Sequence, residues 1–390
     1  MKVLAVFRLA SCALLSCVLA RAAEVTPESM DAGIRRGVDY LLTHQNANGS
    51  WGDALISNDT SVGAGTVGVF HAFRAGATSL ALSGMIDATD GRPETLAAIN
   101  RAATWTATEL PKLRRANLGT FYNVWGHAYG LRAISRLYQR ETEPTKKAEW
   151  SKLAQDQCGF ADRYEDINGG WGYYDLFDGL ATQKPSGTPT SFTTATMLLA
   201  MDQAHKVMGT IFDPKHVSRA VESINLQRAP DFAYTYGSYL WTKPRLDVNR
   251  PAGSLSRTQS CNAALRTYGE KAITDEALIT CLDRFLAREG FLSNVRKRPI
   301  PHEGAFQIAG YFYYYGIFYF TESARLLPPE KQAAYAQKLA EIILSHQEKD
   351  GSWWDFPLYN YHQAYGTGYA LMALTWCRDV LKKAAPITPP

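Results

Sequence analysis

Two ten-residue windows near opposite ends of the chain repeat one pattern. Residues 44–53 read HQNANGSWGD and residues 346–355 read HQEKDGSWWD, with six identical letters out of ten. Further glycine–aromatic landmarks at Trp171, Phe232 and Phe291 are spaced by about 60 residues, once by about 120, as in an internal repeat. The chain is therefore expected to be a repeat architecture in which one landmark, between the first two, is missing.

Each landmark lies between two stretches with helical periodicity. The stretches before the landmarks are charged and amphipathic, as in residues 30–45 and 330–347, whereas those after them are nearly uncharged, as in 191–207 and 365–377. Glycines in the second set would let helix backbones approach one another closely. Six charged helices outside six uncharged ones predict an all-α (α/α)6 toroid, formed as one domain of six helix-pair repeats by residues 24–390.

The repeated loop has the composition of a joint between helices. Gln45 and Gln347 can satisfy unpaired backbone groups at a helix end, the following glycine makes a turn, and Trp51 or Trp353 can pack between neighbouring helices.

The N-terminal residues predict a leader. Residues 1–23 combine Lys2 and Arg8 with an uncharged stretch and the small-residue pattern of Ala20 and Ala22, which is typical of a secretory signal peptide. Export to the periplasm or the extracellular space follows, with lipoprotein anchoring at Cys12 or Cys17 as a minor alternative. The leader accounts for three positive charges, so the formal charge falls from +4 to +1 (4 − 3). We therefore expect no nucleic-acid partner, and no integral membrane segment once the leader is removed.

With these motifs the chain resembles the squalene-hopene cyclase and protein prenyltransferase superfamily. The QW motif of that superfamily, Gln-x-x-x-Gly-x-Trp, is matched at residues 45–51 and 347–353, and more loosely at 169–171. The resemblance implies the toroid fold. It implies little about chemistry, since the same ring serves cyclases, transferases and binding proteins.

The catalytic signatures of that superfamily are incomplete here. The chain contains no pair of adjacent aspartates, so the Asp-x-Asp-Asp acid of class II cyclases is absent. The zinc triad of protein prenyltransferases has weak counterparts in Cys261 and His362, but Gln259 stands where the resemblance implies a carboxylate ligand. A neutral amide is a poor zinc ligand, so zinc is disfavoured and no cofactor is predicted.

Four cysteines remain after the leader: Cys158, Cys261, Cys281 and Cys377. An even number in an exported protein makes disulfides the default expectation. Cys261 and Cys281 lie ten residues either side of Lys271, on two helices expected to be antiparallel. A disulfide, a zinc ligand and an inert thiol are all open for Cys261.

Polar residues on the inner helices are the candidates for lining a central cavity. For each histidine among them, a satisfied wall position is the simpler interpretation. The candidates are His71, Tyr122, His127, Tyr129, Arg257, Gln307, Tyr311, Tyr315, Glu322, His362 and Tyr365.

Acidic residues in two loops are the candidates for acid/base chemistry. Asp175 follows the Trp171 landmark, while His302 and Glu303 are expected to open the fifth inner helix. An acid at such a place is often only a helix cap, but Glu303 or Asp175 with a histidine would suit general acid/base catalysis.

Three functions are open on this basis. The first is an exported, prenyltransferase- or cyclase-like ring that binds, or binds and transforms, a small-molecule ligand such as an isoprenoid in its cavity. The second is a carbohydrate-active (α/α)6 enzyme, a glycoside hydrolase or polysaccharide lyase acting on a glycan. The third is an interaction scaffold resembling the thioester domains of secreted defence proteins, although the Cys-Gly-Glu-Gln signature is absent.

Overall fold

The computed structural model describes residues 25–55, 67–113, 123–172, 189–300 and 308–384. These residues are helical, with isolated β-bridges but no strand among them. The outer helices are α1 (Pro27–Thr43), α3 (Pro93–Glu109), α5 (Pro144–Tyr164), α7 (Pro214–Leu226), α9 (Asp275–Ala287) and α12 (Pro329–Ser345). The inner helices are α2 (Val67–Asp87), α4 (Asn123–Arg140), α6 (Ser191–Met208), α8 (Leu255–Thr267), α11 (Phe312–Ala324) and α13 (His362–Ala384).

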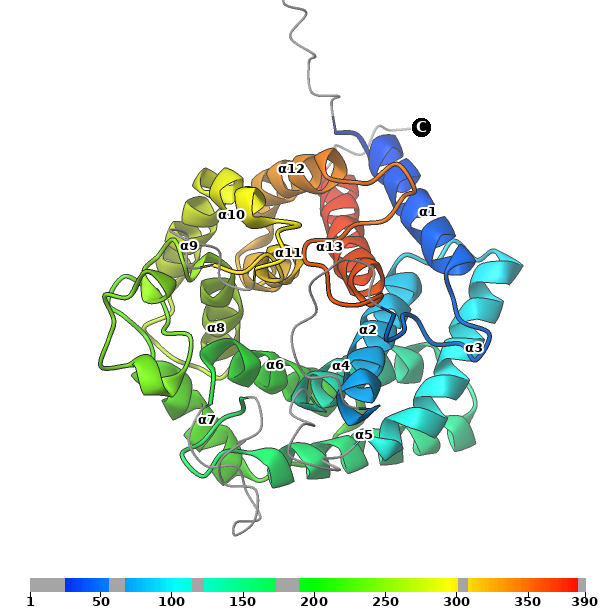
Figure 1. Ribbon diagram of the computed structural model, residues 1–390, viewed down its shortest axis with the longest axis horizontal. Helices are drawn as coiled ribbons and strands as arrows, with labels where there is room; N and C mark the ends of the chain where they lie inside the picture. The colour runs from blue at the N-terminus through cyan, green and yellow to red at the C-terminus, as the bar shows by residue number, and fades with distance from the viewer. Residues whose placement is uncertain (1–24, 56–66, 114–122, 173–188, 301–307, 385–390) are drawn as a thin grey trace, which may run out of the picture.

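The inner helices form a closed ring. Around it, α2 contacts α4, α4 contacts α6, α6 contacts α8, α8 contacts α11, α11 contacts α13, and α13 returns to α2 (Figure 1). Each outer helix packs against the outside of this ring. The predicted all-α (α/α)6 toroid is therefore confirmed.

Local sequence explains why the two sets of helices differ. Five of the outer helices begin with a proline, whose fixed φ and missing N–H suit the first helical position. Thr26 caps α1 in a capping box with Ser29. The inner helices are instead buried on almost every side; residues 255–265 of α8 are all buried. A helix enclosed by an outer helix and two inner neighbours exposes almost no face to water, so polar residues of α8 such as Gln259 are buried and hydrogen-bonded within the protein.

The repeated loops are joints, as their composition predicts. The indole N–H of Trp51 donates to Leu41 O at 2.8 Å, and that of Trp353 donates to Ile343 O at 2.8 Å. The backbone N–H of each tryptophan donates to a threonine on the next inner helix, Thr78 or Thr367, at 3.0 Å.

The glutamines of the two joints tie neighbouring outer helices together. Gln45 donates to Gly49 O and to Ala98 O on α3, at 3.0 and 2.9 Å. Gln347 donates in the same way to Gly351 O and to Gly33 O on α1, both at 2.9 Å. The sixth repeat is thus joined to the first, which closes the outer layer.

The fourth landmark lies two residues beyond its predicted place. Tyr234 forms a bridge with Arg228, as Trp51 does with Gln45, so Tyr234 and not Phe232 takes the tryptophan position. Phe232 takes the glycine position instead, with φ +61° where Gly49 has +91°. The prediction failed because it placed the landmark at the nearest aromatic residue, without showing which residue makes the turn.

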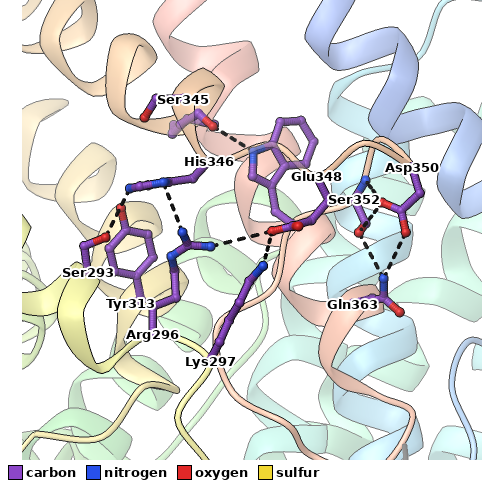
Figure 2. Close-up of polar contacts among 12 residues, drawn as sticks. Ser293, Arg296, Lys297, Tyr313, Ser345, His346, Glu348, Asp350, Ser352 and Gln363 are labelled. Atoms are coloured by element: carbon purple, nitrogen blue, oxygen red, sulfur yellow. Dashed lines mark hydrogen bonds and ion pairs between the residues drawn. The ribbon is translucent and has the colours of Figure 1, made fainter.

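The fifth landmark is not a loop of this kind. Phe291 lies within the short helix α10 (Glu289–Val295). A polar network joins this segment to the loop after α12 (Figure 2). His346 bonds with Ser293 and Arg296 at 3.3 and 3.1 Å, and Lys297 pairs with Glu348 at 2.5 Å.

Two leucines replace the missing landmark. The 3-10 helix η1 (Leu110–Lys112) and the residue after it place Leu110 against Gly130 and Leu113 against Gly126 on α4. Side-chain insertion beside these glycines takes the place of a tryptophan joint.

Within the residues that the structure describes, no helix is long and apolar enough to cross a membrane. The leader predicted at residues 1–23 lies outside those residues.

A candidate ligand cavity in the ring

A cavity of about 300 Å³ lies inside the ring, at the end where the inner helices begin. Residues of α2, α4, α6, α11 and α13 supply most of its wall, together with Tyr311 and loop residues at 236 and 356–361. The lining residues are Ala72, Phe73, Gly76, Ala77, Leu80, Trp125, Tyr129, Phe192, Tyr236, Tyr311, Phe312, Tyr315, Phe356, Leu358, Tyr361, Tyr365 and Tyr369.

Aromatic rings form most of this wall and contact one another. Phe192 lies at its centre, with ring centroids 5.0 Å from Phe312, 5.1 Å from Tyr236 and 5.8 Å from Trp125. Most of these pairs meet edge to face, the arrangement that aromatic quadrupoles favour. The described lining residues include no charged side chain, so the cavity is shaped for an uncharged, largely apolar molecule.

A buried arginine stands behind the wall. Arg257 is 1% exposed, and its guanidinium lies 5.5 Å from the Tyr236 ring centroid and 5.4 Å from that of Phe312. It donates to Gly253 O and Tyr234 O at 3.1 and 3.2 Å. Neutral ring faces and carbonyl oxygens therefore stabilise its charge, and it supports the wall from behind.

A buried ion pair, Arg132 with Glu322, lies close to the lining residues Tyr129 and Tyr369. Arg132 donates to Glu322 at 2.9 Å and lies over the Phe318 ring at 5.1 Å, while Tyr369 donates to the Tyr129 hydroxyl across the ring. Burial opposes ionisation of Glu322, but the Arg132, Arg325 and Arg136 charges and the Arg132 hydrogen bond together hold the carboxyl pKa below its usual value. These groups link three inner helices at the centre of the toroid.

A buried carboxyl contacts the cavity wall through a tyrosine. Asp355 is 0% exposed; its Oδ1 accepts from the Tyr365 hydroxyl at 2.7 Å and its Oδ2 from the Tyr314 backbone N–H at 2.8 Å. Burial raises the pKa of Asp355 to about 7, although both hydrogen bonds act to lower it. A carboxyl of this kind changes protonation near neutral pH.

The structure separates the predicted cavity residues into three groups. Tyr129, Tyr311, Tyr315 and Tyr365 line the cavity. Tyr122 and Gln307 lie outside the described residues, as do the acid/base candidates Asp175, His302 and Glu303. The fifth inner helix begins at Phe312, so the expectation that His302 and Glu303 open it is wrong. The remaining candidates, His71, His127, Arg257, Glu322 and His362, do not line the cavity.

The three histidines are occupied elsewhere in the structure. His71 bonds to Glu109 O at 3.1 Å, His127 to Gln157 Oε1 at 2.7 Å and His362 to Tyr359 O at 2.9 Å. His127 also stacks on an outer-helix ring, that of Phe160, and burial lowers its pKa to about 4. The prediction that they line the cavity was wrong because the helix face they occupy packs against neighbouring elements.

A disulfide between Cys261 and Cys281, one of the three possibilities left open, is not formed in the structure. All four cysteines of the described residues are free, buried thiols. Burial raises the pKa of both Cys261 and Cys281. The helices that carry these cysteines, α8 and α9, contact each other, but neither cysteine forms a disulfide.

The residues considered for zinc have other partners. Gln259 donates to Leu255 O and Cys281 O at 3.3 and 3.1 Å, and His362 packs edge-on to Trp354. No cluster of three histidine, cysteine or acidic residues in the described chain is arranged to hold a metal. Cys261, Gln259 and His362, as the structure places them, therefore do not fit a zinc triad.

Sequence reasoning missed most of the aromatic wall. The candidates named from the sequence were polar side chains. The cavity wall also contains Trp125, Phe192, Phe356, Tyr361 and Tyr369, and Asp355 accepts a hydrogen bond from the wall residue Tyr365. One signal was present: an aromatic residue recurs in the first two turns of five inner helices.

Comparisons with known proteins add evidence on the fold alone. No family model matches the chain, and no curated protein matches its sequence. Among solved structures, it is similar to a type II terpene cyclase, MstE from Scytonema, at 12% identity and a TM-score of 0.52, covering 92% of this chain and 100% of that one.

Two carbohydrate-active proteins are similar to the same degree. The α-1,6-mannanase GH76A of Salegentibacter sp. HEL1_6, in an inactive variant bound to α-1,6-mannotriose, has 11% identity and a TM-score of 0.55, covering 90% of this chain and 99% of that one. Cellobiose 2-epimerase from Spirochaeta thermophila DSM 6192 has 13% identity and a TM-score of 0.56, covering 91% and 98%. Because one ring fold is shared by these different activities, the likeness establishes the toroid and no specific function.

Proposed function

We propose that the protein binds a small, uncharged, terpenoid-like molecule in the aromatic cavity of the ring. The observation that carries this proposal is the wall itself, since twelve of its seventeen described lining residues are aromatic and none is charged. Such a wall favours burial of apolar surface and gives little compensation to a highly hydroxylated or charged molecule.

The cavity volume indicates the size of ligand that the described wall can surround. At roughly 30 Å³ per close-packed small group, 300 Å³ holds about ten non-hydrogen atoms. A compact monoterpenoid is of this size. The same proposal includes export of the protein, a leader at residues 1–23 and one toroid domain at 24–390. It also includes membership of the squalene-hopene cyclase and prenyltransferase superfamily.

A glycan is the second candidate. Aromatic rings also stack on sugars, and a similar toroid binds α-1,6-mannotriose. Glycoside hydrolysis, however, needs two carboxyl groups beside the scissile bond, and the described lining residues supply none. We therefore place the apolar ligand first.

Calorimetric titration tests the proposal with two probes, menthol and α-1,6-mannotriose. Menthol is expected to bind at a single site with a negative heat-capacity change, because apolar surface is buried, and mannotriose is expected not to bind. Binding of mannotriose without menthol would support the glycan candidate, and binding of neither probe would refute the cavity as a site for compact terpenoids.

A further inference from the structure

The aromatic cavity has a hydrogen-bonding point at Tyr365. This residue lines the cavity near the start of α13, and its hydroxyl hydrogen is directed to Asp355 Oδ1 at 2.7 Å, with Phe356 O at 3.3 Å. Among the described residues, no donor contacts the Tyr365 oxygen. Its lone pairs are therefore available to a molecule in the cavity.

We propose that Tyr365, supported by Asp355, recognises a single neutral oxygen group, a hydroxyl or a ketone, on the ligand. The inference rests on the proposed function, because it assumes an apolar ligand in the cavity, and it adds the head group that the ligand carries. Tyr365 contacts the ligand, while Asp355 acts through Tyr365 as a positioning residue.

The direction of the hydrogen bond depends on the Asp355 proton. When the carboxyl is ionised, it accepts the Tyr365 hydrogen, and the tyrosine oxygen offers only lone pairs to the ligand, which suits a hydroxyl donor. When the carboxyl is protonated, it can donate to the Tyr365 oxygen, which leaves the phenolic hydrogen free for a ketone acceptor. Ketone binding therefore falls as the carboxyl ionises.

The groups around Asp355 are consistent with such a change near neutral pH. Tyr365 and Tyr369 face it from α13, Tyr314 faces it from α11, and Arg296 approaches from the segment after α10. The Arg296 charge favours the carboxylate, yet no cation of the described residues lies within ion-pair distance of Asp355. Burial outweighs these effects and brings the pKa of Asp355 to about 7.

The test compares menthone and menthol, which share a carbon skeleton and differ only in the oxygen group, at about pH 5 and about pH 9. In the wild type, the affinity ratio of menthone to menthol is expected to fall roughly tenfold as the pH rises, since one hydrogen bond is exchanged. The ratio is expected to become independent of pH in both Tyr365→Phe and Asp355→Asn.

Tyr361→Phe is the matched control. Tyr361 also lines the cavity, but its hydroxyl donates to Phe70 O at 3.2 Å and not to Asp355, so the pH dependence should persist. A constant ratio in the wild type, or a pH dependence that survives in Tyr365→Phe, would overturn the inference while leaving apolar binding intact. If neither probe binds the wild type at either pH, the proposed function fails as well.

Discussion

At the residue scale, burial determines what the polar side chains do. His127 and Arg257 were candidates for ligand contacts because of their chemistry, yet both are enclosed and paired within the protein. Asp355 is the converse case: it occurs as the last letter of a repeated loop motif, and only the packing of α11 and α13 around it shows that it is buried.

The buried carboxyl gives a prediction about stability. Because the folded-state pKa of Asp355 is raised to about 7 from about 3.9 in an unfolded chain, its contribution to stability is complete below about pH 4 and is lost as the pH rises through 7. The loss is at most about 4 kcal/mol, from roughly three pKa units.

Urea unfolding of the wild type and Asp355→Asn at about pH 5 and about pH 8 measures this effect. The wild type should lose stability relative to the variant as the pH rises. Asp156→Asn, at an exposed carboxyl of α5, should follow the wild type. Equal pH dependence in wild type and Asp355→Asn would show that the carboxyl does not titrate in this range.

At the element scale, the sequence predicted the helices well and the joints in part. Helical periodicity was enough for the six pairs, because inner and outer helices differ so clearly in charge. The fourth and fifth landmarks were misplaced, since an aromatic letter alone does not show which residue adopts positive φ, as Phe232 does, or that Phe291 lies in a helix. The cavity lining depends on which turns of separate helices meet, and this information lies in no single repeat.

The joint geometry predicts a large effect at Gly351. This residue has φ +91°, and an added Cβ would clash with the backbone oxygen of Arg36 on α1. Gly351→Ala should therefore lower the free energy of unfolding by about 3 kcal/mol, from backbone strain plus overpacking. Gly91→Ala is the matched control, with φ +74° but no atom within 4 Å of the added Cβ, and should cost about 1–2 kcal/mol. Equal losses in the two variants, measured by urea unfolding, would refute the role of the joint contact.

At the scale of the whole molecule, the ring brings residues of five inner helices, α2, α4, α6, α11 and α13, around a common space. The closing contacts between α13 and α2, together with ion pairs from Arg378 and Lys382 to Asp31 on α1, join the two ends of the chain. The aromatic cavity is therefore a property of the closed toroid and of no single repeat.

The most direct measurement of the central claim is the affinity for menthol of two glycine variants. Gly76 lines the cavity on α2, and an added Cβ there has no neighbour closer than 4.0 Å, so Gly76→Phe should place its ring in the cavity. Gly159→Phe, at an exposed helical glycine of α5 with open space around it, is the control. We predict at least a tenfold loss of menthol affinity in Gly76→Phe and none in Gly159→Phe; an unchanged affinity in folded Gly76→Phe would contradict ligand binding in this cavity.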